Sequence, residues 1–448
     1  MTVDSRRTGA VARMLDQESL ALQTRLARIQ PFALQETMLP AAALLPEAQT
    51  AIERFLISGR RELHNEIRDY RRWLHGDGRA VPPAEMQRRY AVLKLRFGNI
   101  ISHFELFSDA ITQRSERENG VWLSGLDAVA QDALELPGYL DPPPVICYLD
   151  RGPGAAIRRA RTRLPGGKRM PVAIVRMPRE RMIGHGIASS LVHEVGHQGA
   201  ALLDLVSSLR NALGQAAPPD ERATWRVWQR WISEIVADLW SVARVGVTST
   251  LGLISVVSLP RFFVFRIDLH DPHPAPWLRV KLSCALGNAI YPHPQWAALA
   301  QLWDDCYPLQ GLDARTRETF LTLQRTIPRV AHVLCSHRPR ALRGGQLAPV
   351  LASPERSPQA LIETWHHWRR APAQMFRSRP SLVFAVLGQA RLQGELEPVH
   401  ESRVLGDLLT HWALRSTLDL SQACAAFTAE RRRAATRPRR VEKQPAIA

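Results

Sequence analysis

Two histidines and a glutamate in the segment LVHEVGHQ form the pattern in this chain that is most able to support chemistry. His193 and His197 stand four residues apart, and Glu194 directly follows the first histidine. On an α-helix this spacing places both imidazoles on one face, where they can bind a single Zn²⁺ ion. A carboxylate beside the metal that is not itself a ligand can act on a water molecule, so Glu194 has the position of a general base. The pattern therefore indicates a hydrolytic zinc site.

A second acidic pair follows along the chain. Glu234 and Asp238 form an ExxxD pattern among tryptophans and aliphatic residues, which favours a buried helix over residues 221–244. If this helix packs antiparallel to the one that carries the histidines, a rise of about 1.5 Å per residue returns Glu234 nearly level with His197. Asp238 then comes level with His193. The first carboxylate is expected to complete the metal site, and the second to accept the free ring N–H of a ligand histidine.

These two helices are the elements that must position the site. The pattern around the histidines predicts one helix over residues 186–213, and Asp220 is expected to cap the helix that follows it. Gly196 and Gly199 lie inside the first helix, where each costs about 1 kcal/mol relative to alanine. We therefore expect another part of the protein to approach closely at these glycines.

A third group lies downstream, in the segment HDPHPAPWLR. His273 and Pro274 precede Arg279, which stands six residues after the histidine. With these three motifs in order, the chain resembles the gluzincin metallopeptidases over roughly residues 171–285. It is most similar to the branch that contains the CAAX prenyl proteases and the HtpX-type proteases. The resemblance implies that His273 and Arg279 line the active site, where they stabilise a developing oxyanion or bind product.

The same resemblance implies a catalytic centre in which His193, His197 and Glu234 bind the zinc ion. Asp238 would accept a hydrogen bond from one of these ligands without binding the metal itself. Glu194 would take a proton from the attacking water and pass it to the leaving amine. On this interpretation the chain is a soluble, zinc-dependent metallopeptidase that acts on a protein or peptide substrate.

A non-enzymatic role stays open at this stage. In that alternative, zinc only joins two helices, and a basic surface binds nucleic acid or an acidic partner. The formal net charge of +17 permits such binding, although the cations are nearly all arginine, as a GC-rich coding sequence would give. An intact Glu194 favours the enzyme, since a structural site has no use for a free carboxylate beside the metal.

Length and composition limit the kind of protein that this chain can form. The chain has 448 residues, enough for two or three domains, with 45% hydrophobic and 23% charged residues. Five cysteines form no CxxC pair, which indicates reduced thiols. The first residues carry no apolar signal-peptide core, and the most apolar run, residues 245–265, is interrupted by Pro260 and Arg261. We therefore expect a cytoplasmic protein with no membrane span.

The expected fold is mainly α with a small β-sheet, and its centre is a zincin-like core in which the HExxH helix packs antiparallel to the ExxxD helix. Residues 1–135 are expected to form a helical region, residues 136–300 the metallopeptidase core and residues 301–428 a second helical region. Residues 429–448 read as a basic, disordered tail.

Local patterns predict the elements around this core. Apolar residues recur at helical spacing over residues 51–75 and 84–113, and the short break between them predicts an antiparallel helical hairpin. Residues 145–149 and 171–177 are expected to be strands. An exposed edge of such a sheet, directly before the metal-binding helix, can hold an extended peptide through main-chain hydrogen bonds.

Overall fold

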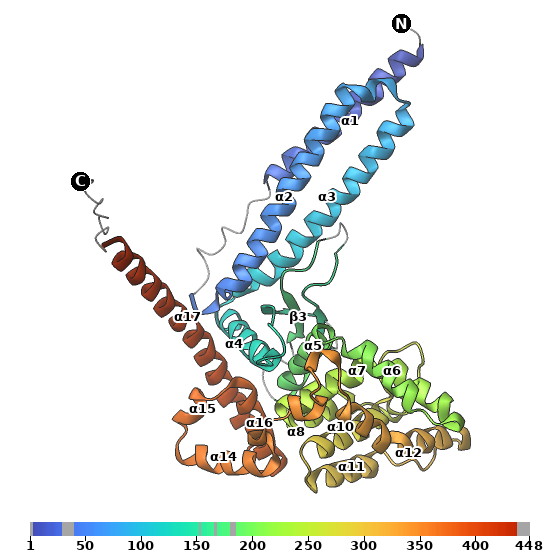
Figure 1. Ribbon diagram of the computed structural model, residues 1–448, viewed down its shortest axis with the longest axis vertical. Helices are drawn as coiled ribbons and strands as arrows, with labels where there is room; N and C mark the ends of the chain where they lie inside the picture. Colours follow the sequence, from blue (N-terminus) through green and yellow to red (C-terminus); the bar gives the residue numbers. More distant parts are fainter. Residues whose placement is uncertain (1–2, 29–39, 152–153, 165–167, 180–184, 437–448) are drawn as a thin grey trace, which may run out of the picture.

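The computed structural model describes residues 3–28, 40–151, 154–164, 168–179 and 185–436. It is mostly helical with one small sheet, so the predicted fold class is confirmed at this level. A long helical arm projects from a body that holds the sheet and most of the other helices (Figure 1).

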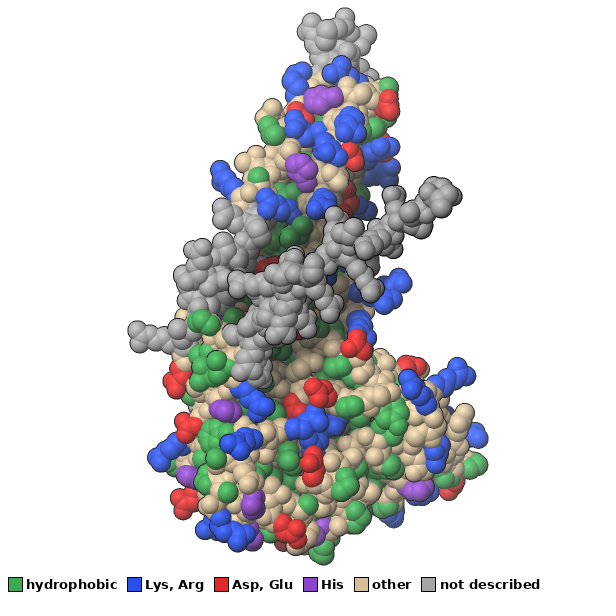
Figure 2. Space-filling view, turned by 60° about the vertical axis from the view of Figure 1, so that its left-hand side comes forward, with side chains coloured by type: hydrophobic (Ala, Val, Ile, Leu, Met, Phe, Trp, Pro, Cys, Tyr) green, Lys and Arg blue, Asp and Glu red, His purple; other side chains and the backbone are tan. Residues whose placement is uncertain are grey.

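Three helices form the arm: α1 (Val3–Arg28), α2 (Pro46–His75) and α3 (Pro83–Thr112). The buried residues of α2 recur every three or four positions, which is the period of a helix with one apolar face; they are Ala48, Ile52, Leu56, Gly59, Leu63, Ile67, Tyr70 and Leu74. The Tyr70 hydroxyl donates a hydrogen bond to the carbonyl of Met86 near the end where α2 and α3 are joined. The predicted antiparallel hairpin is therefore confirmed, and α1 packs beside it. Figure 2 shows Lys and Arg side chains along the arm, mixed with acidic ones.

Helix α4 (Arg117–Leu134) leads into a three-stranded sheet made of β1 (Val145–Asp150), β2 (Ala156–Arg158) and β3 (Ala173–Pro178). The strand order is β1-β3-β2, with β1 parallel and β2 antiparallel to β3. Both predicted strands are present. The short strand β2 lies between them in the sequence, in a segment for which no strand is predicted.

The outer edge of β1 is closed by side chains. The amide of Gln113 exchanges two hydrogen bonds of 2.7 Å with the main chain of Leu149. The Asp127 carboxylate accepts from the N–H of Cys147 at 2.7 Å, and Arg114 donates to the carbonyl of the same residue, also at 2.7 Å. These bonds replace those that a further strand would make, so this edge is not available for strand pairing.

The helix that carries the histidines is shorter than predicted. Instead of one helix over residues 186–213, the structure has α5 (His185–Leu202) and α6 (Leu205–Ala216). The helix is interrupted at Asp204, which adopts a left-handed conformation with φ of 51°. Aspartate enters this region more readily than most residues, and helix periodicity in the sequence does not register a single such residue.

Helix α7 (Arg222–Val245) follows a short 3₁₀ turn, Pro219–Glu221. Asp220 lies inside that turn, and no side chain caps the start of α7, so the predicted cap is wrong. The chain enters α7 directly from the 3₁₀ turn, without a capping side chain. Gly246 ends the helix with φ of 56°, as its position in the sequence predicts.

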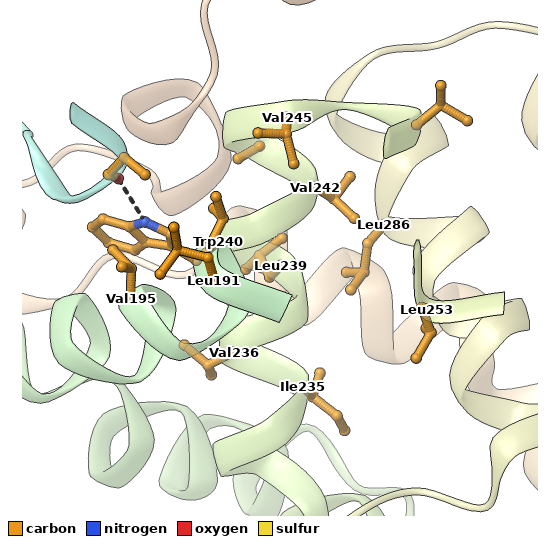
Figure 3. Packing of buried hydrophobic residues seen from close by; sticks show 14 of the residues in the cluster. Leu191, Val195, Ile235, Val236, Leu239, Trp240, Val242, Val245, Leu253 and Leu286 are labelled. Atoms are coloured by element: carbon orange, nitrogen blue, oxygen red, sulfur yellow. Dashed lines mark hydrogen bonds between the residues drawn. The ribbon is translucent and has the colours of Figure 1, made fainter. Parts of the chain in front are cut away.

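The rest of the body is helical. Its elements are α8 (Val247–Val257), α9 (Arg261–Val264), α10 (Pro276–Ile290), α11 (Gln295–Cys306), α12 (Ala314–Ser336), α13 (Leu347–Leu351), α14 (Pro358–Arg370), α15 (Ala373–Arg377), α16 (Pro380–Leu392) and α17 (Pro398–Thr436). One hydrophobic core extends from Leu123 on α4 to Trp412 on α17. Figure 3 shows part of this core, where Leu191 and Val195 of α5 lie beside Trp240 of α7.

Two expectations, about the apolar run in the middle of the chain and about its basic C-terminal segment, can be compared with the structure. The apolar run over residues 245–265 contributes to two short helices, and in the described part of the chain no helix combines the length and apolarity that crossing a bilayer requires. The expected cytoplasmic location stays a prediction. Helix α17 continues to Thr436, so residues 429–436 of the predicted disordered tail are helical, and residues 437–448 lie outside the described residues.

Candidate metal centre

His193 and His197 on α5 meet Glu234 on α7. One oxygen of Glu234 lies 3.2 Å from Nε2 of His193, and the other lies 3.4 Å from Nε2 of His197. The three side chains offer ligand atoms that all lie within 4.8 Å of one another, and no other group of this kind occurs among the described residues. Their side chains are only 13%, 15% and 9% exposed. The three residues can therefore hold a metal ion between the two helices.

The two glycines of α5 let α7 come this close. A Cβ atom added at Gly196 would lie 2.9 Å from the main chain of Ala237, and one added at Gly199 would lie 2.6 Å from the indole ring of Trp240. Either contact would push the helices apart. The expectation of a close approach at these glycines is confirmed, and this approach keeps Glu234 within reach of the histidines.

Asp238 and Arg279 both contact His193 and support its ring. An oxygen of Asp238 lies 2.8 Å from Nδ1 of His193. Arg279, from α10, donates two hydrogen bonds to the same carboxylate, at 2.7 and 2.9 Å. A carboxylate at Nδ1 holds the proton on that nitrogen and leaves Nε2 free to bind a metal. Together, these contacts also show that α5 and α7 run antiparallel, because residue 193 meets residue 238.

The carboxylate of Glu234 stays ionised despite its burial. Burial raises the pKa of Glu234, but hydrogen bonds with His193, His197 and His273 outweigh it and hold that pKa far below its usual range. Burial lowers the pKa of His193, but the carboxylates of Asp238 and Glu234 outweigh it and raise that pKa to about 9. The same contacts therefore lower the pKa of the acid and raise that of the imidazole, as expected for groups whose charged forms stabilise each other.

Glu194 lies next to the ligand group and outside it. Counted over the whole residue, main chain included, Glu194 is 8% exposed, and Glu234 and Asp238 are each 7% exposed. Although burial lowers the pKa of Arg279, the three carboxylates hold it above its usual value, which places Glu194 in the same electrostatic environment. Three buried carboxylates and one guanidinium leave an excess of two negative charges when the histidines are neutral. A divalent cation matches both this excess and the nitrogen and oxygen donors.

His273 reaches the centre from the loop before α10. Its Nε2 lies 3.2 Å from Glu234, and its side chain is 49% exposed, so it stands at the open rim of the site. Its Nδ1 lies 2.6 Å from Asp271, a residue that the sequence interpretation missed. The sequence does carry a signal for Asp271: an Asp two residues before another residue typically accepts a hydrogen bond from the main-chain N–H of that residue and so closes a turn. Asp268 and His270 form a second turn of the same kind.

The structure thus brings the residues singled out in the sequence to one place, with His193, His197 and Glu234 at the centre. Asp238 and Arg279 lie behind His193. Comparison with known proteins adds no identity: no protein family matches this sequence, and neither a curated protein nor a solved structure matches the chain. The chemistry of these side chains is therefore the basis for assigning a function.

Proposed function

We propose that this protein is a zinc-dependent metallopeptidase. The observation that carries the proposal is the convergence of two imidazoles and one carboxylate from antiparallel helices, with a further buried carboxylate, Glu194, left outside the set. Three protein ligands leave a fourth position for water or substrate, as catalytic zinc sites require, whereas structural sites use four protein ligands. His273 is close to Glu234 but is not part of the ligand group.

Glu194 has the role of general base in this proposal. When bound, zinc lowers the pKa of a coordinated water and polarises the scissile carbonyl. Glu194 accepts a proton from the attacking water and later donates it to the leaving amine. Because Glu194 is largely shielded from solvent, little bulk water competes for its proton.

The remaining residues position and stabilise. His273, held by Asp271, donates a hydrogen bond to the oxyanion that develops on the substrate. Arg279 donates from Nε and Nη2 of its guanidinium to Asp238, and Asp238 in turn fixes the ring of His193. Arg279 therefore acts as a positioning residue, which leaves oxyanion stabilisation to His273.

Replacement of the proposed base tests the function. The Glu194→Gln variant is expected to bind as much zinc as the wild type and to cleave peptides about 10²–10⁴-fold more slowly. Metal content is measured by mass spectrometry on purified protein, and cleavage with a mixed peptide library. Full activity in this variant, or activity that survives complete metal removal, would sink the proposal. A fourth protein ligand in X-ray absorption, together with no cleavage, would instead favour a structural zinc site in a binding protein.

A further inference from the structure

Strand β2 and the turn after it form a strongly basic element, which we call the basic hairpin and define as residues 156–164 and 168–170. The sequence from residue 151 to residue 170 contains no Asp or Glu. The cations of the basic hairpin are Arg158, Arg159, Arg161, Arg163, Lys168 and Arg169.

Most of this charge is not neutralised. Arg161 lies 3.7 Å from Asp141, and Lys168 lies 2.8 Å from Glu62 on α2. The other four arginines are exposed and make no ion pair within the described part of the chain. The charge of the basic hairpin also acts on α3, where burial and the charges of Arg158 and Lys168 lower the pKa of His103.

The outer edge of β2 is open. This strand is the last of the sheet and pairs only with β3, and no further strand adds to it among the described residues. By contrast, side chains cover the outer edge of β1, at the opposite side of the sheet. An extended peptide can therefore pair its main chain with β2 but not with β1.

A single buried side chain connects the segment after β2 to α5, the helix that carries the two histidines. Gln198 of α5 is fully buried and accepts a hydrogen bond of 2.7 Å from the main-chain N–H of Ala160. Gln198 stands four residues after Glu194, so the two side chains share one face of α5. The segment that follows β2 is therefore fixed on the side of α5 that carries the proposed base.

The pairing of β2 with β3 divides its side chains between two surfaces. Ile157 pairs with Val175, which belongs to the core that contains α5. Arg158 pairs with Ile174, which belongs to the cluster at the base of the arm. Paired residues point to the same face of a sheet, so on a strand added beside β2 every second side chain would lie on the face of Arg158.

We propose that the basic hairpin binds acidic substrate segments, which pair with the edge of β2 and place acidic side chains at every second position. This inference rests on the proposed peptidase function, because it names the substrate class of the same site. Charge complementarity selects the occupant, and the open strand edge selects a peptide over nucleic acid. A phosphate backbone would satisfy the arginines but has no main-chain N–H and C=O to pair with β2.

Binding is tested separately from cleavage, with the full-length, zinc-loaded Glu194→Gln protein. The probe is a fluorescent peptide with Glu at alternate positions, compared with the same peptide carrying Gln. The Glu peptide is expected to bind about tenfold more tightly, and R158E/R159E to abolish that preference. R158Q/R159Q, which introduces no repulsion, is expected to weaken it. The matched control is R315E/R317E, two exposed arginines at the start of α12, and it should change nothing.

The outcomes separate the two proposals. Equal binding of the Glu and Gln peptides, or an unchanged preference in R158E/R159E, overturns the inference. Wild-type protein that cleaves both peptides equally also overturns it and leaves the peptidase function standing. Hairpin-dependent binding of the Glu peptide without any cleavage by the wild type supports acidic-peptide recognition and rejects the peptidase. Duplex DNA that binds through Arg158 and Arg159 while the Glu peptide does not bind would also overturn the inference.

Discussion

Two of the buried carboxylate sites in the described part of this protein differ in what balances their charge. At the edge of β1, Asp127 pairs with Arg114 at 2.9 Å, and the two side chains are 2% and 0% exposed. One carboxylate and one guanidinium cancel, and main-chain groups of Cys147 take further hydrogen bonds. At the metal centre, three buried carboxylates face one guanidinium, and the half-exposed His273 opens the cluster to solvent.

The two clusters also differ in the direction of their pKa shifts. Burial raises the pKa of Asp127 and outweighs the opposing effect of Arg114. Burial also acts on Glu234, but its imidazole partners reverse the result and lower its pKa. Burial of charge therefore does not by itself mark a functional site. The informative property is an excess of charge of one sign, next to a part of the site that is open to solvent.

The largest effect is expected at the closed cluster. Asp127→Ala leaves the Arg114 guanidinium buried without its counter-charge, which should lower the free energy of unfolding by about 3–5 kcal/mol. The double variant Arg114→Met/Asp127→Leu removes both charges and should cost less. Urea unfolding of the single and double variants measures this difference, and metal content should stay unchanged in both. If the single variant were as stable as the double, the pair would not act as a compensated ion pair.

Metal removal is expected to affect only the open cluster. A ligand present at about 100 times its Kd stabilises the folded state by about 2.7 kcal/mol, so a chelator should lower the Tm of the wild type. Glu234→Gln should abolish this chelator-dependent shift, because it removes one of the three ligands. Asp127→Ala should keep the shift, since Asp127 is not part of the candidate ligand group. A wild-type Tm that does not respond to the chelator would place no metal between α5 and α7.

The sequence predicted the arm well because its apolar residues keep a helical period over long segments. The ligands of the candidate site could be placed for a related reason. Helix geometry fixes which faces His193 and His197 share, and an antiparallel partner brings Glu234 level with them. Both predictions use only local periodicity and one assumption about packing.

Other features depend on tertiary structure and leave no periodic signal. The break at Asp204 is a single left-handed residue, and β2 has three residues, too few to show alternation. The side chains that close the edge of β1 come from α4 and from the 3₁₀ turn before it, 20 to 36 residues earlier in the chain. Asp271 could have been found from its turn, but nothing local distinguishes it from Asp268, and only the structure shows which turn faces the metal centre.

These twin turns allow a matched test of His273. Asp271→Asn keeps a hydrogen-bond acceptor but removes the charge that orients the imidazole, so kcat should fall about tenfold, or about 1.4 kcal/mol of barrier, with little change in KM. Asp268→Asn makes the same change beside His270 and should leave kcat unchanged. Steady-state peptide cleavage measures both. Equal losses in the two variants would mean that the loop, and not His273, supports the reaction.

The carboxylate of Asp16, near the surface, extends the comparison to a partly exposed ion pair. Asp16 on α1 lies 2.7 Å from Arg71, and the two side chains are 15% and 29% exposed. The hydrogen bond from Arg71 outweighs burial and lowers the pKa of Asp16, as the imidazoles do for Glu234. A carboxyl group with a lowered folded pKa stabilises the fold above its ordinary pKa of about 3.9, and this contribution is lost as the pH falls through the folded pKa.

Asp16→Asn should therefore destabilise the arm by about 0.5–1 kcal/mol at pH 7, and the difference from the wild type should shrink in acid and at high salt. Hydrogen exchange in α1 measures this. Asp69→Asn is the control, because Asp69 is 59% exposed beside Arg72 and should have no measurable effect. The small cost at Asp16 follows from solvent, which replaces a lost partner there but not at Asp127. A loss at Asp16 as large as that at Asp127, and equal at pH 3 and pH 7, would show that burial and not charge balance separates the clusters.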